Sequence, residues 1–361
     1  MKARVIAMYL PQFHPIPEND SAWGKGFTEW TNVSLAKPLF RGHYQPHVPA
    51  DLGFYDLRMP EVRQAQADMA RDVGIEGFMY WHYWFGKGRM LLERPFKEVL
   101  ESGKPNFPFC LGWANHNWTI KEWKKGNAFQ KDPMIMEQLY PGKDDYIAHF
   151  NYCLPAFKDK RYITVEGKPV FTIFAPFDMP DAKEFIKSWR QLATENGLPG
   201  IHFVGLRYNY HTMEELLNLG FDAINDRPFG EAEARYNHSR LIARARMALR
   251  RWGIMLEKYD YKRLMRLSVM QDDYKDNCYP TILSGFDRTA RSGRQACMYV
   301  NYTPEAFREH VKRELDLVKN KELEHKIIYL MSWNEWGEGN HMEPDIKYGH
   351  AFLDILKEEI K

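Results

Sequence analysis

The chain has 361 residues, of which 44% are hydrophobic and 27% are charged. This composition excludes intrinsically disordered and fibrous proteins. The formal net charge is only +2, so no overall basic field indicates a nucleic-acid partner. The length fits about two ordinary domains or one (β/α)8 barrel with insertions.

Near the N-terminus, the apolar run 5–10 is shorter than the apolar core of a signal peptide and is followed by Pro11. No stretch approaches the roughly 20 apolar residues that cross a bilayer. We therefore expect a cytoplasmic protein without an integral membrane segment. The cysteines form no CxxC pair, and we expect buried free thiols at Cys110, Cys153, Cys278 and Cys297.

Short apolar runs are mostly separated by longer amphipathic segments. The predicted strands, in chain order, are 5–10, 75–84, 107–113, a hairpin over 162–174, 201–206, 221–224, 280–285 and 326–333. The predicted helices are 60–72, 90–102, 144–157, 180–196, 212–219, 304–320 and 348–361. This alternation favours an α/β fold with a parallel sheet, and eight units favour a closed (β/α)8 TIM barrel with long loops. No GxGxxG follows a strand and no linker divides the chain, so we expect one catalytic domain over 1–361 rather than a dinucleotide-binding sheet.

A basic, helix-like insertion is expected at about 232–266. From Arg235 to Arg266 it carries ten basic and two acidic residues, a net charge of +8. Three roles fit such a segment: a solvated helical face, a peripheral contact with an anionic membrane surface, or a contact with an acidic polysaccharide.

Aromatic and polar side chains gather where the predicted strands end, which is where barrels of this kind carry their chemistry. Rings stack on the C–H faces of sugars, and sugar hydroxyls need several donors and acceptors, so the pattern predicts a carbohydrate substrate. The candidate substrate-binding residues are Tyr9, Gln12, His14, Trp30, Tyr80, His82, Tyr83, Trp84, Trp113, Asn115, Asn117, Trp118, Arg207, Asp226, Trp333, Asn334 and Trp336. Any one of them could instead belong to the core or cap a loop, and the prediction depends on their joint occurrence at six strand ends.

The sharpest signal is the carboxylate pair Glu335 and Glu338, which stands among two tryptophans and two glycines after the last strand. Glycoside cleavage needs two carboxyl groups at one site, one protonated as an acid and one ionised as a base or nucleophile. The alternative is a surface turn with two solvated glutamates. We predict that Glu335 and Glu338 are the catalytic residues.

The other polar groups are weaker candidates for catalysis or metal binding. Glu343 and Asp345 are expected to be structural or to start a helix. The chain has 13 histidines but no HExxH or compact HxH motif, and a site built from His14, His43 and His47 is a weak alternative. We expect neither a metal nor a cofactor.

Several motifs together resemble the WbsX-like proteins, relatives of glycoside hydrolase family 99 that are often found in polysaccharide gene clusters. The motifs are 9–14 (YLPQFH), 26–30 (GFTEW), 45–46 (QP), 51–56 (DLGFYD), 81–85 (WHYWF), 113–115 (WAN) and 333–339 (WNEWGEG). The resemblance runs from residue 4 to about residue 353 and is weaker through the insertion. It implies a (β/α)8 barrel that acts on sugars, with Glu335 as base and Glu338 as acid. Relatives read Trp-Ala-Asn-Glu where this chain has His116 after Asn115. If that acid binds substrate in the relatives, the specificity of this chain does not follow from theirs.

The resemblance also implies a mechanism without a carboxylate nucleophile. The sugar's own 2-hydroxyl attacks C1, a 1,2-anhydro sugar forms, and water opens it with net retention. Such a route requires O2 and the leaving group to be trans and axial, as in α-mannose or α-rhamnose. The alternatives are a glycosyltransferase of surface-polysaccharide (O-antigen) biosynthesis and a non-catalytic glycan-binding barrel.

Overall fold

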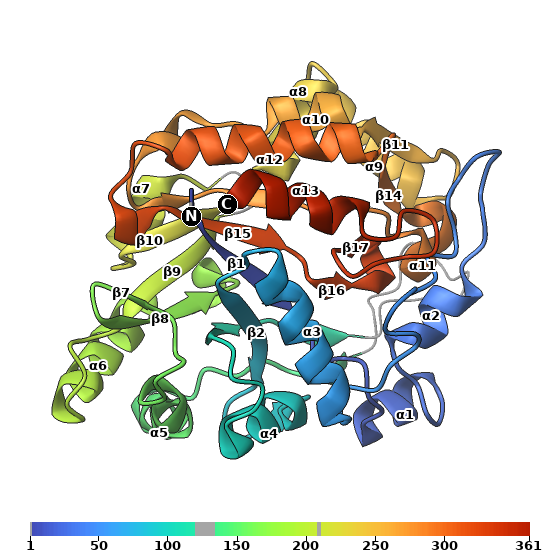
Figure 1. The fold of residues 1–361 in the computed structure, drawn as a ribbon. Coiled ribbons are helices and arrows are strands. Elements are labelled where there is room, and N and C mark those ends of the chain that lie inside the picture. The colour runs from blue at the N-terminus through green and yellow to red at the C-terminus, as the bar shows by residue number, and fades with distance from the viewer. Residues whose placement is uncertain (1, 120–133, 208–210) are drawn as a thin grey trace.

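A ring of parallel strands forms the centre of the molecule (Figure 1). The computed structural model describes residues 2–119, 134–207 and 211–361. The ring strands, in spatial order, are β1 (Arg4–Tyr9), β2 (Gly77–Trp84), β4 (Phe109–Trp113), β8 (Lys168–Ile173), β9 (His202–Arg207), β10 (Ala223–Asp226), β12 (Cys278–Tyr279), β13 (Thr281–Leu283) and β15 (Ile327–Met331). Spatial order thus equals chain order, as expected when each strand is followed by a crossover helix.

The ring closes at a strand that is interrupted by Pro280. The first half, β12, pairs with β10, and the second half, β13, pairs with β15, which in turn pairs with β1. Proline has no N–H to give to a ladder, so a break at this residue is expected. Its carbonyl still accepts a hydrogen bond of 3.0 Å from the Tyr329 N–H. Because β12 and β13 together occupy one strand position, the barrel has eight strand positions, and the predicted (β/α)8 fold is confirmed.

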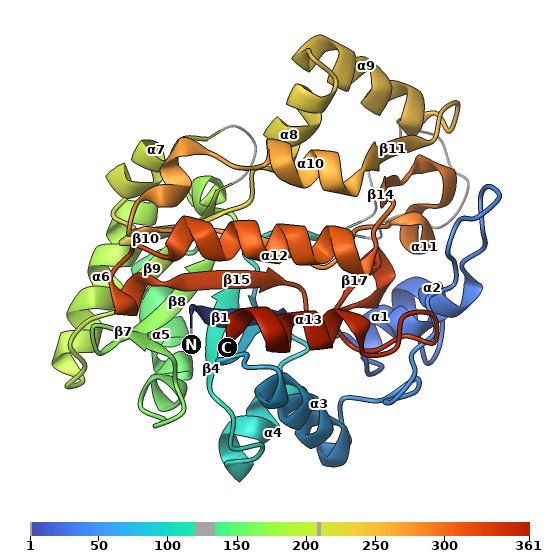
Figure 2. The ribbon, with the colours of Figure 1, turned by 45° about the horizontal axis from the view of Figure 1, so that its top comes forward.

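Helices surround the barrel on its outer side (Figures 1 and 2). They are α3 (Pro60–Asp72), α4 (Arg94–Ser102), α5 (Lys143–Phe157), α6 (Ala182–Glu195), α7 (Met213–Asn218), α12 (Pro304–Val318) and α13 (Ala351–Ile360). The prediction of 60–72 is confirmed, because Pro60 starts the helix and Gly74 follows its end. The prediction of a helix from residue 90 was wrong at its start: Met90 and Leu91 form β3 and pair with the end of β2.

The loops carry further short elements. Those before β15 are α1 (Pro17–Trp23), α2 (Glu29–Leu35), β5 (Trp118–Thr119), β6 (Met134–Met136), β7 (Thr164–Val165), η1 (Pro176–Asp178), η2 (Gln271–Tyr274), α11 (Thr289–Ser292), η3 (Gly293–Gln295), β14 (Cys297–Val300) and η4 (Leu323–His325). Those after β15 are β16 (Asn334–Glu335), η5 (Trp336–Glu338) and β17 (Asn340–His341). The two helices α1 and α2 lie between the predicted strand 5–10 and the predicted helix 60–72, where the sequence analysis placed neither a helix nor a strand.

The basic insertion is mainly helical. It consists of α8 (Phe229–Tyr236), α9 (Arg240–Arg251), β11 (Glu257–Asp260) and α10 (Tyr261–Leu267). The short strand β11 pairs with β14 and joins the insertion to the loop after the seventh barrel position. Helix α9 projects beyond the rest of the molecule (Figure 2).

One large hydrophobic cluster extends from Ala3 to Ile360. The four cysteines are buried and free, as predicted. Among the described residues, no helix combines the length and the apolar character needed to cross a bilayer.

Candidate active site at the carboxyl end of the barrel

A cavity of about 400 Å³ opens where the barrel strands end. Seven of the eight strand positions contribute residues to its wall, at the end of the strand or just after it. These residues are Gln12, Tyr83, Asn117, Phe174, Arg227, Phe286 and Glu335. The long loop after β1 adds two further aromatic side chains, Trp23 and Phe27. The cavity therefore combines ring faces with charged and amide groups.

Both predicted catalytic carboxylates line this cavity and share one arginine. Arg291, on α11, reaches Glu335 Oε1 with Nη2 at 2.6 Å and Glu338 Oε1 with Nη1 at 2.7 Å. A second guanidinium, that of Arg288, lies 3.2 Å from the same Glu338 oxygen. The short elements β16 and η5 carry the two glutamates, so the predicted pairing of these side chains at one site is present.

A third carboxylate, Glu29 at the start of α2, also binds Arg291, at 2.9 Å. The backbone of Gly337 makes room for this arrangement. A Cβ at position 337 would collide with Glu29 Oε2 and lie 2.9 Å from Arg291 Nε. The glycine between the two glutamates is therefore needed for Arg291 to reach all three acids.

The acids face different environments. Burial raises the pKa of Glu335 to about 8; Arg291 opposes this rise, and the neighbouring Glu338 and Glu29 add to it. Glu335 therefore keeps its proton to a higher pH than an exposed carboxyl group does. A perturbed carboxyl group in a cleft is a common mark of acid–base chemistry.

Arg227, immediately after β10, brings another positive charge to the cavity. Burial lowers its pKa to about 10, so it remains charged at neutral pH. Its Nη2 lies 2.7 Å from the Met331 sulfur, and no carboxylate within salt-bridge distance is found for it in the described part of the chain. The wall therefore holds three arginines and three glutamates.

The predicted substrate-binding residues divide into two groups by the alternation of side chains along strands. On β2, Trp81 and Tyr83 line the cavity, whereas Tyr80, His82 and Trp84 point to the opposite side. Of the predicted residues, those in the lining are Gln12, Tyr83, Asn117 and Trp118, together with Glu335 and Glu338. The others lie outside it.

Some of the outlying residues build a buried network around Glu343. Its carboxylate accepts hydrogen bonds from Trp336 Nε1 at 2.6 Å, Gln66 Nε2 at 2.6 Å and the Tyr55 hydroxyl at 2.8 Å. Tyr9 in turn donates to Gln66 at 2.7 Å. Burial raises the pKa of Glu343 to about 7. The network ties the segment that carries the two catalytic candidates to Gln66 on α3 and to Tyr55.

Two asparagines bind backbone rather than face the cavity. Asn115 accepts from the Ala175 N–H at 2.7 Å and donates to the Ala175 carbonyl at 2.8 Å. Asn334 makes the same two-way bond to Leu10, at 2.8 and 3.0 Å. Each clamps one loop at the cavity rim to another.

The remaining outlying residues belong to the core. Trp30 donates to the Tyr55 carbonyl, Trp113 donates to the Trp84 carbonyl, and Trp333 is fully buried. Arg207 and Asp226 form a buried ion pair of 2.6 Å. Residues 208–209, which follow Arg207 at the predicted strand end, lie outside the described residues. The other buried members of this set are His14 and Tyr80.

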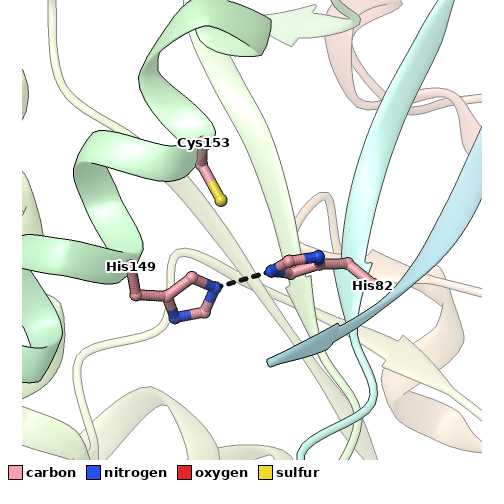
Figure 3. Close-up of side chains that lie close together, drawn as sticks. All are labelled: His82, His149 and Cys153. Atoms are coloured by element: carbon pink, nitrogen blue, oxygen red, sulfur yellow. Dashed lines mark hydrogen bonds between the residues drawn. The ribbon is translucent and has the colours of Figure 1, made fainter. Parts of the chain in front are cut away.

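His82 lies against helix α5, where Figure 3 shows it facing His149 with Cys153 above. The two Nε2 atoms are 2.8 Å apart. Burial lowers the pKa of His82 to about 3 and that of His149 well below its usual range, so both rings are neutral and one proton lies between them. The three side chains offer ligand atoms within 4.8 Å of one another, but all three are sealed in the core, away from the cavity.

His14 lies outside the cavity that His43 and His47 line, so the three histidines do not form one site. His43 Nε2 lies 2.7 Å from Asp287 Oδ2, and His47 Nδ1 lies 2.9 Å from His341 Nε2. Both histidines line a second cavity of about 400 Å³, whose rings include Tyr44 and Tyr348. Phe286 lines both cavities.

Sequence reasoning missed several members of the wall. Glu29 stands beside the selected Trp30, Arg227 beside Asp226, and His116 beside Asn115, so in each case the neighbouring position was chosen. Arg288 and Arg291 lie in a loop with no apolar pattern, and only their place after a predicted strand could have indicated them.

Comparisons with known proteins agree with this architecture. In its fold, the chain is a glycoside-hydrolase-like (β/α)8 barrel. A solved glycoside hydrolase-like protein matches with a TM-score of 0.65 at 14% identity, covering 99% of this chain and 94% of the other. The GH99 endo-α-mannosidase from Bacteroides thetaiotaomicron, in complex with Bis-Tris propane, matches with a TM-score of 0.58 at 14% identity, covering 100% and 96%.

The family is shown by sequence. The model of the family Glycosyltransferase WbsX matches residues 5–356. Two WxcX proteins of Xanthomonas campestris pv. campestris, from strains B100 and ATCC 33913, are each 33% identical over 364 residues, which cover 100% of this chain and 50% of the relative. The chain thus spans about half the length of these relatives. It belongs to the WbsX family.

Proposed function

We propose that the protein is a retaining glycoside hydrolase that cleaves an α-manno- or α-rhamno-configured bond in a polysaccharide. The observation that carries this proposal is the carboxyl pair Glu335 and Glu338, bound to one arginine in an aromatic-lined cavity at the carboxyl end of a (β/α)8 barrel. One protein that shares the fold is named an endo-α-mannosidase, which agrees with an α-manno substrate.

In the first step, the Glu335 carboxylate removes the proton from the sugar's 2-hydroxyl. O2 attacks C1 and forms the C1–O2 bond while the bond from C1 to the leaving oxygen breaks. Glu338, as a carboxylic acid, gives its proton to that oxygen. The products are a 1,2-anhydro sugar and the shortened glycan, and the negative charge has passed from Glu335 to Glu338.

In the second step, Glu338 removes a proton from water, which attacks C1. The C1–O2 bond breaks, and Glu335 returns its proton to O2. Two inversions at C1 give net retention, and both glutamates regain their starting states. Arg291 binds both side chains at once and stabilises whichever one is ionised.

The experiment is a screen of the protein against α-mannosides and α-rhamnosides, with NMR detection of the anomer formed first. We expect the retained α-anomer. First release of the β-anomer would exclude the anhydro-sugar route, because a single displacement by water inverts C1. Persistent inactivity, together with binding that survives Glu335→Gln, would favour a non-catalytic glycan-binding barrel.

A second candidate is a glycosyltransferase, and Arg227 is the observation that favours it beside the family's name. Within the described residues, this buried guanidinium has no carboxylate at salt-bridge distance, so it could bind the diphosphate of a nucleotide-sugar donor. A thermal shift by a nucleotide-sugar that is lost in Arg227→Gln would support the transferase. No shift, combined with hydrolysis of a glycoside, would support the hydrolase.

A further inference from the structure

Helix α9 exposes large apolar side chains on one face. The helix contains no buried residue. Leu241 is 74% exposed, Ile242 is 51% exposed and Trp252, at the helix end, is 60% exposed. Surface helices normally turn such side chains inward. Here, four polar contacts explain why they point outward.

The opposite face of α9 is tied to the body of the protein. Arg246 donates to Asn237 Oδ1 at 2.6 Å and lies over the Tyr259 ring at 5.2 Å. Arg250 Nη1 binds the buried carboxylate of Glu257 at 2.8 Å. Ser239 caps the helix by accepting from the Leu241 N–H. At 100° per residue, positions 246 and 250 lie opposite 241 and 252, so these bonds fix the apolar face toward solvent.

Positive charge borders the apolar face. Arg244 and Arg251 are exposed and share one flank of the helix, and neither has a carboxylate partner in the described part of the chain. The segment 240–256 contains five arginines and no aspartate or glutamate. An apolar strip edged by arginines, with a tryptophan at its end, is the pattern of a helix that lies in the plane of a membrane interface.

We propose that α9 docks the protein on an anionic lipid surface. Its apolar side chains would enter the boundary between headgroups and acyl chains, while Arg244 and Arg251 bind lipid phosphates. Its 12 residues are about 18 Å long at 1.5 Å per residue, too short to cross a bilayer, so the contact is peripheral. An acidic polysaccharide offers the same charge but no apolar interior for Leu241 and Ile242, which is why lipid is favoured.

The test is flotation of the full chain with two kinds of vesicle, phosphatidylcholine alone and phosphatidylcholine with phosphatidylglycerol. We expect flotation only with the anionic vesicles. Arg244→Gln/Arg251→Gln should weaken partitioning about 30-fold, which corresponds to about 2 kcal/mol at roughly 1 kcal/mol per basic residue. Leu241→Ser/Ile242→Ser should weaken it roughly tenfold or more through lost apolar contact.

Matched controls come from other exposed positions. Lys183→Gln/Lys187→Gln removes the same charge from α6, and Leu323→Ser/Ile346→Ser removes exposed apolar side chains far from α9 in sequence. Both should float like the wild type, and circular dichroism should show all variants folded.

Three results would overturn the proposal. The first is an absence of flotation with either vesicle. The second is a loss of flotation in Arg244→Gln/Arg251→Gln but not in Leu241→Ser/Ile242→Ser, together with binding to dextran sulfate. This result would identify an acidic polysaccharide as the partner. The third is a change of molecular mass in light scattering on Leu241→Ser/Ile242→Ser, which would show that the face joins two copies of the chain.

Discussion

Two groups of buried carboxylates lie within one short stretch of the chain, and they are stabilised in different ways. Glu335 and Glu338 share the charge of Arg291 with Glu29 and face the cavity. Glu343 instead receives three neutral hydrogen bonds and faces only protein. Carboxyl groups whose proton can reach a substrate serve acid–base chemistry, whereas a carboxylate whose oxygens are all occupied by protein donors serves the fold. Burial and a raised pKa alone do not distinguish the two groups.

The largest effect is expected from removing an acid of the cavity. Glu335→Gln and Glu338→Gln should each lower kcat/KM by about 10²–10⁴-fold, the usual worth of one proton-transfer role. Glutamine keeps the shape and the oxygen that Arg291 binds, so the melting temperature should change little. Steady-state assays on a confirmed substrate and thermal melts check this, and near-native turnover in either variant would remove that residue from the mechanism.

Arg291→Met should destabilise the protein by about 3–5 kcal/mol, because it leaves three buried carboxylates without their shared cation. Lowering the pH should restore part of this loss, since protonated carboxyls need no counter-charge. Denaturant unfolding at two pH values measures the effect. Arg244→Met, at an exposed position, is the control, and an equal change in both variants would contradict the argument.

Glu343→Gln should cost about 1–3 kcal/mol of stability, because one amide N–H would face a hydrogen-bond donor instead of an acceptor. Turnover should stay within a few-fold of the wild type, in contrast to the variants of the first group. A fall in activity as large as that of Glu335→Gln would mean that the two groups act as one.

The smallest effect concerns pH. As a base, Glu335 must be ionised, so kcat/KM should rise with pH up to about 8, where the buried carboxyl loses its proton. Glu343→Gln should leave this rise of kcat/KM with pH unchanged. Falling activity from pH 6 to 8 would instead assign Glu335 as the acid.

Glu343 should affect the pH dependence of stability instead. Its pKa is raised from 4.5 to about 7, so its contribution to the free energy of unfolding is present below pH 4.5 and is lost as pH rises toward 7.

Much of the fold was predictable because it depends on local patterns. Helix 60–72 has its proline and glycine at the ends, and the barrel strands are short buried runs between helices. The helix α2 was not predictable from apolar spacing, because Glu29 and Asn32 are buried on it for contact with the cavity rather than with the core.

The candidate site was predicted in position but only partly in membership. The ends of the strands did lie at the cavity. However, adjacent residues were predicted to bind substrate together, although side chains alternate along a strand and every second one points to the outer layer. Trp81 lines the cavity, for example, whereas His82 binds His149. The central cation was missed because Arg291 is close to Glu335 only through the pairing of β13 with β15, which brings together the loops after the seventh and eighth positions.

Phe286 is shared by the linings of the two cavities. Shortening it to alanine would remove a side chain that both hollows contact, without changing any acid or arginine of the first cavity. Phe286→Ala is therefore expected to add space to both hollows at once.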